Sequence, residues 1–307
     1  MTTTAKVAIF VETPLQLLCA YEVKSRAPEN NVDLWVRFTG RGSNDAQLLV
    51  MLDLLGLHYY KLKIPTGKVF LGCVLNFFKL SLIVFKRYDR VYVGSYFSGF
   101  LNLLKKLASP HEIYFLDDGV ATFWAAKEIL QKKVAGSLFT FFKLPYDVER
   151  RLDIEQHSFE GLRSRYVTDK KYNDSYFIGQ PLLDKNQASE EDYFNAIGAA
   201  MASAHGRFYY ISHRVESVEL LERIRVELGV DVLRLDSSIE IFFLTGTFAP
   251  SQLHTCYSSA LFSLAIMFPN CRIYSYKLKS LDLFTVPHYQ DIEEAISSLP
   301  NAKYIEV

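Results

Sequence analysis

Cysteine is scarce in this sequence. Its 307 residues include four, Cys19, Cys73, Cys256 and Cys271, which lie far apart and mostly within apolar runs. They have neither the paired spacing of a metal site nor the density of a secreted disulfide scaffold. The first six residues lead directly into an apolar stretch, without the long apolar helix and cleavage site of a signal peptide. We therefore expect small reduced cysteines in the core of a cytoplasmic protein.

The sequence also lacks net charge, because 34 Lys and Arg residues balance 34 Asp and Glu residues. The balance is uneven along the chain: residues 1–175 hold 24 basic and 18 acidic side chains, and the remainder holds 10 and 16. A basic front half is compatible with an anionic phospholipid surface, although an ordinary solvated face would look the same. It is too weakly basic to predict a nucleic-acid partner.

No apolar run is long enough to predict a membrane span. The strongest candidate, residues 69–85, is apolar apart from Asn76, Lys79 and Ser81. It falls short of the ~20 residues that cross a bilayer, and a lysine lies well inside it. The segment instead predicts a helix that is buried or faces a membrane.

What the sequence does have is ample material for a core, since 50% of its residues are hydrophobic and 14% are aromatic. In the first half, strand-like and helical stretches alternate. We expect strands at 7–11, 33–38, 59–62, 90–93 and just before Asp117, and helices at 14–23, 45–55, 69–85 and 97–107. Strands separated by helices predict a parallel sheet with right-handed crossovers, which is a Rossmann-like layer.

A second alternation follows a looser pattern at residues 123–171. An apolar strand closed by Gly179 and Pro181 predicts the domain boundary. We expect strands at 176–182, 208–212, near 232, 239–244 and 272–274, and helices at 190–204, 218–228, 258–267 and 292–298. The sequence thus predicts an α/β fold of two Rossmann-like domains, residues 1–175 and 176–307, with the ligand in a cleft between them.

Three groups of polar residues follow these apolar runs. Asp117 and Asp118 end one predicted strand, His213 ends another, and Ser258 and Ser259 open a later helix. Each group has a structural alternative, because acids and serines often only cap helices and a lone His is more often structural than catalytic. The functional interpretation is that the acids and the His lie where an open α/β sheet holds its ligand, and that the serines bind a phosphate at a helix amino terminus.

In combination these residues resemble the motif set of bacterial sialyltransferases. Residues 13–18 (TPLQLL) and 177–181 (FIGQP) look like the same set, so the resemblance covers about residues 10 to 264. It is closest to glycosyltransferase family 52, the lipooligosaccharide sialyltransferases, with the capsular polysialyltransferases and the marine-type sialyltransferases as more distant kin. One departure is that the family's His is typically followed by Pro, whereas His213 is followed by Arg214.

The resemblance implies a two-domain GT-B fold that transfers sialic acid from CMP-sialic acid to a sugar hydroxyl, such as that of a terminal galactose. The transfer would proceed with inversion and without a metal ion or other cofactor. Asp117 would be the general base and Asp118 its substitute, because neighbours on a strand point to opposite faces. His213 would protonate the departing phosphate, and Ser258 and Ser259 would hold it.

Five further residues are candidates for contacts with the donor or the acceptor. Glu240, on a predicted strand, would bind the donor ribose. Ser212 and Arg214 would lie at the donor, although Arg214 has no family role and is equally suited to a donor oxyanion or to the surface. Thr13 and Gln16 follow the first strand and would face the acceptor, with simple helix capping as the alternative for Thr13.

The implied acceptor is an oligosaccharide or glycolipid of bacterial lipopolysaccharide, capsule or O-antigen. The apolar helix and the basic front half fit a peripheral contact with the inner face of the cytoplasmic membrane. We expect no nucleic-acid partner, and a homodimer stays open. Two alternatives remain: a transferase of another CMP-activated ulosonic acid, of the pseudaminic, legionaminic or Kdo type, and a non-catalytic partner in polysaccharide assembly.

Overall fold

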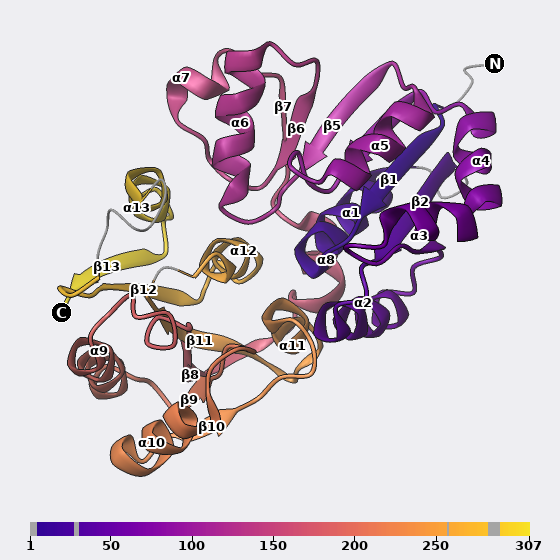
Figure 1. Ribbon diagram of the computed structural model, residues 1–307. Helices are drawn as coiled ribbons and strands as arrows, with labels where there is room; N and C mark the ends of the chain where they lie inside the picture. Colours follow the sequence, from indigo (N-terminus) through magenta and orange to yellow (C-terminus); the bar gives the residue numbers. More distant parts are fainter. Residues whose placement is uncertain (1–4, 28–30, 257, 282–288) are drawn as a thin grey trace. The chain divides into compact units, whose positions relative to one another are not determined.

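The chain folds into two compact units, each built on one parallel sheet (Figure 1). The computed structural model describes residues 5–27, 31–256, 258–281 and 289–307. The units are Met1–Leu162 and Arg163–Val307, so the boundary lies earlier than the one we expect from the sequence. The α/β fold class and the parallel sheets are confirmed.

The first unit holds a seven-stranded sheet in the order β3-β2-β1-β4-β5-β6-β7. Its strands are β1 (Val7–Val11), β2 (Val32–Phe38), β3 (Tyr60–Lys63), β4 (Arg90–Val93), β5 (Glu112–Leu116), β6 (Ser137–Thr140) and β7 (Ile154–Gln156). Its helices are α1 (Pro14–Arg26), α2 (Gly42–Leu54), α3 (Val69–Leu75), α4 (Phe77–Lys86), α5 (Gly99–Ala108), α6 (Ala121–Lys132), α7 (Tyr146–Glu149) and α8 (Glu160–Tyr166), whose last residues cross into the second unit.

The position of each strand follows from its composition. Central β1 reads VAIFV and is buried along its whole length, as a strand covered on both faces must be. The outer strands β3 (YKLK) and β7 (IEQ) carry charged residues, which suit a sheet edge. The strand order reverses between β1 and β4, and open α/β sheets bind their ligands at such a switch point.

The second unit holds a six-stranded parallel sheet in the order β10-β9-β8-β11-β12-β13, with its switch point between β8 and β11. Its strands are β8 (Lys171–Ile178), β9 (Phe208–Ile211), β10 (Asp231–Leu233), β11 (Phe248–Thr255), β12 (Arg272–Lys277) and β13 (Ala302–Glu306). Its remaining helices are α9 (Glu190–Ala202), α10 (Val218–Leu228), α11 (Ile239–Thr245), α12 (Ala260–Met267) and α13 (Tyr289–Ser297).

One predicted strand is wrong, because residues 239–244 lie in helix α11. The apolar run IEIFFL looks like a strand by composition. Ser238 favours a helix instead, because its side chain accepts a hydrogen bond from the N–H of Ile241 and caps the helix there. The buried residues then recur at helical spacing, at Glu240, Ile241, Phe243 and Leu244.

Residues 69–85 form two helices instead of one. Helices α3 and α4 meet at Asn76 with a bend of 75°. Within the part of the chain that the structure describes, no single helix is long and apolar enough to cross a membrane, although this bent pair taken together is. The four cysteines lie outside disulfides, and Cys19, Cys256 and Cys271 are buried, as expected.

The cap of α11 can be tested directly. We expect Ser238→Ala to lower the free energy of unfolding by about 1 kcal/mol, because the Ile241 N–H loses its acceptor. Ser238→Asp keeps an acceptor and should stay near the wild type. Urea unfolding followed by circular dichroism gives both values, and equal stability of Ser238→Ala and Ser238→Asp would contradict the cap.

Candidate functional site

One candidate site lies in the first unit, at the carboxyl ends of β1, β4 and β5. Gln16, in the first turn of α1, is buried there. Its Oε1 accepts a hydrogen bond from the N–H of Glu12 (2.9 Å), and its Nε2 donates to Oδ1 of Asp118 (2.8 Å). Gly94, just after β4, leaves room for this amide, since a Cβ at that position would lie 2.3 Å from Gln16 Oε1. Gln16 and Asp118, two of the residues singled out in the sequence, are therefore hydrogen-bonded to each other.

Asp118 has the environment of a tuned base. It is half-buried, and its carboxylate accepts hydrogen bonds from Gln16 and Ser95. Burial raises the pKa of Asp118, and the charges of Glu12 and Asp117 act in the same direction, while the two hydrogen bonds oppose them. The net rise makes this carboxylate a better proton acceptor than an ordinary aspartate.

Glu12 extends the polar edge toward β2. Its carboxylate pairs with Nη1 of Arg37 at 2.7 Å, and both side chains are largely buried. Arg37 also donates from Nε to the carbonyl oxygen of Ile64, and its guanidinium lies over the ring of Phe100. Neither member of this pair was predicted as a site residue. The sequence holds one signal for it, because Arg37 is a charged residue near the end of a buried apolar strand.

Asp117 points into the interior of the first unit instead. It is 0% exposed, its Oδ1 accepts from Oγ1 of Thr140 (2.6 Å), and its Oδ2 accepts from the N–H of Phe141 (2.8 Å). The preference for Asp117 as the base does not fit this burial, because a base must reach the acceptor hydroxyl. Alternation along the strand sends one acid to the core and leaves Asp118 at the edge.

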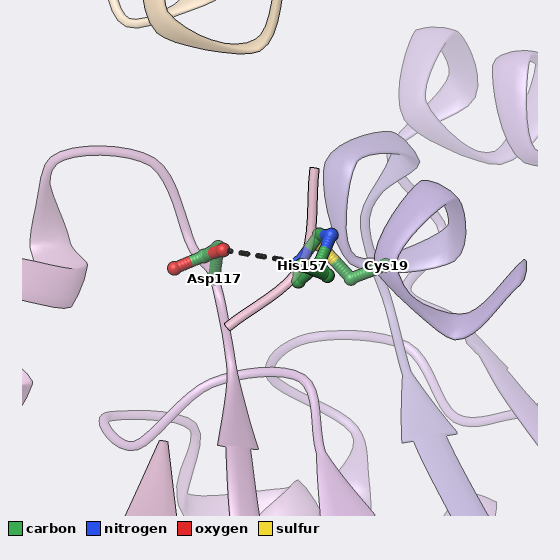
Figure 2. Close-up of side chains that lie close together, drawn as sticks. All are labelled: Cys19, Asp117 and His157. Atoms are coloured by element: carbon green, nitrogen blue, oxygen red, sulfur yellow. Dashed lines mark ion pairs between the residues drawn. The ribbon is translucent and has the colours of Figure 1, made fainter. Parts of the chain in front are cut away.

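Asp117 also belongs to a buried cluster with Cys19 of α1 and His157, which follows β7 (Figure 2). Their donor atoms lie within 4.8 Å of one another, and His157 Nε2 is 3.7 Å from Asp117 Oδ2. Thiolate, imidazole and carboxylate are a donor set for zinc. A catalytic zinc needs an open position, however, and all three residues are closed off from solvent, so this cluster suits a structural ion at most.

A second candidate site lies in the second unit, at the carboxyl end of β9. His213 is half-buried there, and burial lowers its pKa, with the charges of Arg214 and Lys185 adding to the effect. Its Nδ1 accepts a hydrogen bond from the N–H of Val215 (3.4 Å). The neutral ring therefore carries its proton on Nε2, where it can be donated to a ligand.

Glu216 holds this loop and was not found from the sequence. It is 4% exposed, its Oε2 accepts from the N–H of His213 (2.6 Å), and its Oε1 accepts from the hydroxyl of Tyr210 (2.6 Å). Burial is the main cause that raises its pKa, to about 7. Gly179 lets this carboxylate approach β8, because a Cβ there would lie 2.6 Å from Glu216 Oε2. The missed signal is the three-residue spacing from His213 to Glu216, which resembles a capping box.

The other predicted donor residues are dispersed around the second sheet. The hydroxyl of Ser212 donates to the carbonyl of Leu233 (3.2 Å), and Arg214 is exposed. Ser258 and Ser259 lie between β11 and α12, where Ser258 Oγ accepts from the N–H of Ala260 (3.3 Å). Ser259 is the N-cap residue of α12 by position, but its side chain makes no capping hydrogen bond.

Glu240 and Thr13 differ from expectation in their local structure. Glu240 lies on helix α11 and not on a strand, and its Oε1 accepts a hydrogen bond from Oγ of Ser263 (2.8 Å). Thr13 is the N-cap residue of α1, yet its side chain does not cap that helix. Within the described residues, the buried Thr13 Oγ1 has no hydrogen-bond partner.

Comparison with known proteins identifies the fold. No family model matches the sequence, and no curated protein matches it. Among solved structures, a putative UDP-N-acetylglucosamine 2-epimerase from Listeria monocytogenes is similar with a TM-score of 0.59 and 14% identity, over 89% of this chain and 79% of that one. The UDP-GlcNAc 2-epimerase from Methanocaldococcus jannaschii, in complex with UDP-GlcNAc and UDP, has a TM-score of 0.55 and 11% identity, over 97% and 93%.

The heptosyltransferase WaaC from E. coli, with ADP, has a TM-score of 0.50 and 14% identity, over 98% of this chain and 91% of that one. These likenesses confirm the GT-B fold. They overturn the assignment to the family 52 sialyltransferases, because the similar structures are UDP-sugar enzymes and a heptosyltransferase. The short motifs therefore identify the fold and not that family.

The raised pKa of Glu216 predicts how the stability of the protein changes with pH. Its pKa is raised from 4.5 to about 7, so the folded state favours the protonated form. This stabilisation is complete below pH 4.5 and is lost as the pH rises to about 7, which amounts to about 3 kcal/mol. We expect the wild type to lose that much stability relative to Glu216→Gln over this range. Urea unfolding at a series of pH values measures it, and parallel profiles of the two proteins would refute the raised pKa.

Proposed function

We propose that this chain is a glycosyltransferase that moves a sugar from a nucleotide-activated donor to a hydroxyl group, with Asp118 as the general base. The observation that carries the proposal is the placement of Asp118. It is a half-buried carboxylate with a raised pKa, held by Gln16 and Ser95 at the carboxyl edge of the first sheet. Open α/β sheets bind their ligands at that edge.

The first unit would supply the acceptor side of the reaction. Asp118 takes the proton from the acceptor hydroxyl as its oxygen attacks the anomeric carbon of the donor sugar, and the bond to the nucleotide phosphate breaks with inversion. Gln16 and Ser95 keep the carboxylate in one orientation. The entropic cost of orienting the base is therefore not part of the activation barrier. Thr13, which follows β1 at the same edge of the sheet, stays a candidate contact for the acceptor.

The second unit would supply the donor side. His213 donates a hydrogen bond from Nε2 to the departing phosphate, and exposed Arg214 beside it offers a charge for the same oxygens. The positive end of the α12 dipole, next to Ser258 and Ser259, favours a second anion contact. Ser212 and Glu240 stay candidates for contacts to the nucleoside, although the carboxylate of Glu240 already binds Ser263.

We further propose that transfer needs no metal ion. The donor-side groups above can together offset the charge that develops on a leaving phosphate. The one described cluster with metal-ligand spacing, Cys19, Asp117 and His157, is closed off from solvent and therefore out of a substrate's reach. Chelation should therefore leave turnover intact.

Uridine, cytidine and adenosine nucleotides are the candidate donors, the last because the similar heptosyltransferase structure holds ADP. Two of the similar structures are named as UDP-GlcNAc 2-epimerases, one of them with bound UDP-GlcNAc and UDP, which supports a uridine donor. The same names suggest a second candidate function, epimerisation at C2 of a UDP-sugar, which requires no acceptor. CMP-sialic acid and CMP-Kdo stay predictions from the sequence that a donor panel can test.

The test begins with nucleotide release from UDP-GlcNAc, UDP-glucose, ADP-heptose, CMP-sialic acid and CMP-Kdo, in EDTA, with and without an acceptor glycolipid extract. We expect Asp118→Asn to lower acceptor-dependent release by at least about 100-fold, because the base is lost while the hydrogen bond with Gln16 can be kept. The acid limb of the wild-type pH profile should lie above the usual range of an aspartate, since the pKa of Asp118 is raised.

Asp53→Asn is the matched control, since Asp53 is an exposed carboxylate on α2. It should leave release unchanged, and His213→Ala should slow it with every donor that binds. Appearance of the C2 epimer by NMR without acceptor would replace glycosyl transfer with epimerisation. Full activity of Asp118→Asn would remove Asp118 as the base.

A further inference from the structure

Helices α3 and α4 carry an exposed apolar surface that is unusual for a folded domain. Nine large apolar side chains lie within 16 consecutive residues and are more than 40% exposed, and Phe70 and Phe78 reach 84%. They are Phe70, Leu71, Val74, Leu75, Phe77, Phe78, Leu82, Val84 and Phe85. We call this set the α3–α4 surface. Contiguous apolar exposure of this kind marks a site of interaction with a protein or a membrane.

The α3–α4 surface is built into the unit and does not hang loosely from it. Gly72 is the buried residue of α3 and packs directly on Ile64, since a Cβ there would lie 2.9 Å from Ile64 Cγ2. At the bend, Asn76 donates to the carbonyl oxygens of Lys63 (3.1 Å) and Gly72 (2.9 Å). Ile83 is the buried residue of α4. Helix α3 is thus anchored through Gly72, helix α4 packs against α5, and both present most of their large apolar side chains outward.

The chain segment that forms this surface carries charge of one sign. Residues 54–88 contain six basic residues and no Asp or Glu. Lys63, Lys68, Lys79 and Arg87 are exposed, and Lys86 pairs with Asp33. An apolar surface among cations fits a bilayer with anionic lipids, because the apolar side chains enter the acyl region while the cations meet the headgroups.

We propose that the α3–α4 surface inserts into one leaflet of an anionic phospholipid bilayer. Neither helix is long enough to span it, and the bend of 75° lets both lie near the interfacial plane. The charge decides against a second copy of this chain as the occupant, because pairing two such surfaces would bring like charges together.

A line of contacts connects this surface to the candidate site. Asp118 binds Gln16, whose Oε1 binds the N–H of Glu12, and Glu12 pairs with Arg37. Arg37 in turn binds the carbonyl of Ile64, the residue on which Gly72 of α3 packs. This step rests on the proposed glycosyl transfer. The acceptor would then be a lipid-linked glycan, which would reach the carboxyl edge of the first sheet from the membrane.

Vesicle cosedimentation tests the surface independently of catalysis. The probe is the full chain with vesicles of phosphatidylglycerol and phosphatidylcholine, or of phosphatidylcholine alone. We expect binding to the anionic vesicles, and a loss of at least about 100-fold in the triple variant Phe70→Ser, Phe78→Ser, Phe85→Ser, because three inserted rings are removed. The matched control Val218→Ser, Val226→Ser, Phe248→Ser removes three exposed apolar side chains of the second unit and should bind like the wild type.

Two further variants separate the components. Lys63→Gln with Lys68→Gln should weaken binding about fivefold per lysine and reduce its salt dependence. In the variant Phe78→Trp, the fluorescence emission of the introduced tryptophan should shift to shorter wavelength when vesicles are added. Lipids with brominated acyl chains should quench this fluorescence. Asp118→Asn should bind vesicles normally, so a failed glycosyl transfer and a failed membrane surface give different results. Equal vesicle binding by the wild type and the Phe triple variant would overturn the proposal. So would a wild type that does not bind vesicles but forms a dimer, if the Phe triple variant is monomeric.

Discussion

Parallel strand pairing is the constraint on which the rest of this structure depends. Every named strand pair in both sheets is parallel, so all strands of a sheet end at the same edge. The polar residues that follow β1, β4 and β5 are therefore collected at one place although they are far apart in the sequence. The cost is that the strands must be apolar on both faces, which is why almost every charged group of interest lies just beyond a strand end.

The two units solve the same packing problem in the same way. In each, a glycine directly after a strand near the switch point leaves room for a polar side chain: Gly94 for the amide of Gln16, and Gly179 for the carboxylate of Glu216. Those side chains in turn fix a neighbour that is better placed to meet a ligand, Asp118 in the first unit and the loop of His213 in the second. Burying the supporting group and leaving its partner half-exposed combines a defined geometry with access.

Hydrophobic periodicity was enough to predict the alternation of strands and helices and the Rossmann-like character of both units. It failed where elements are short, as in β6 and β7, and where a capped apolar helix has the composition of a strand, as in α11. It also missed the eight-residue strand β11, which begins with Phe-Ala-Pro-Ser and lacks a clear apolar alternation. Strand alternation predicts that only one of Asp117 and Asp118 faces the edge, but which one depends on the neighbours Thr140 and Phe141, which no local pattern reveals. The family assignment failed for a related reason: acids, a His and serines after strands are what many parallel sheets place at their ligand edge.

The bend at Asn76 has a consequence for membrane shape. Helices of seven and ten residues rise about 10 and 15 Å, which is at most about half of the ~30 Å hydrocarbon core. Lying flat in a single leaflet, they would add area to that leaflet and none to the other. The protein would then act as a shallow wedge, with a preference for outwardly curved or loosely packed lipid over flat, tightly packed lipid.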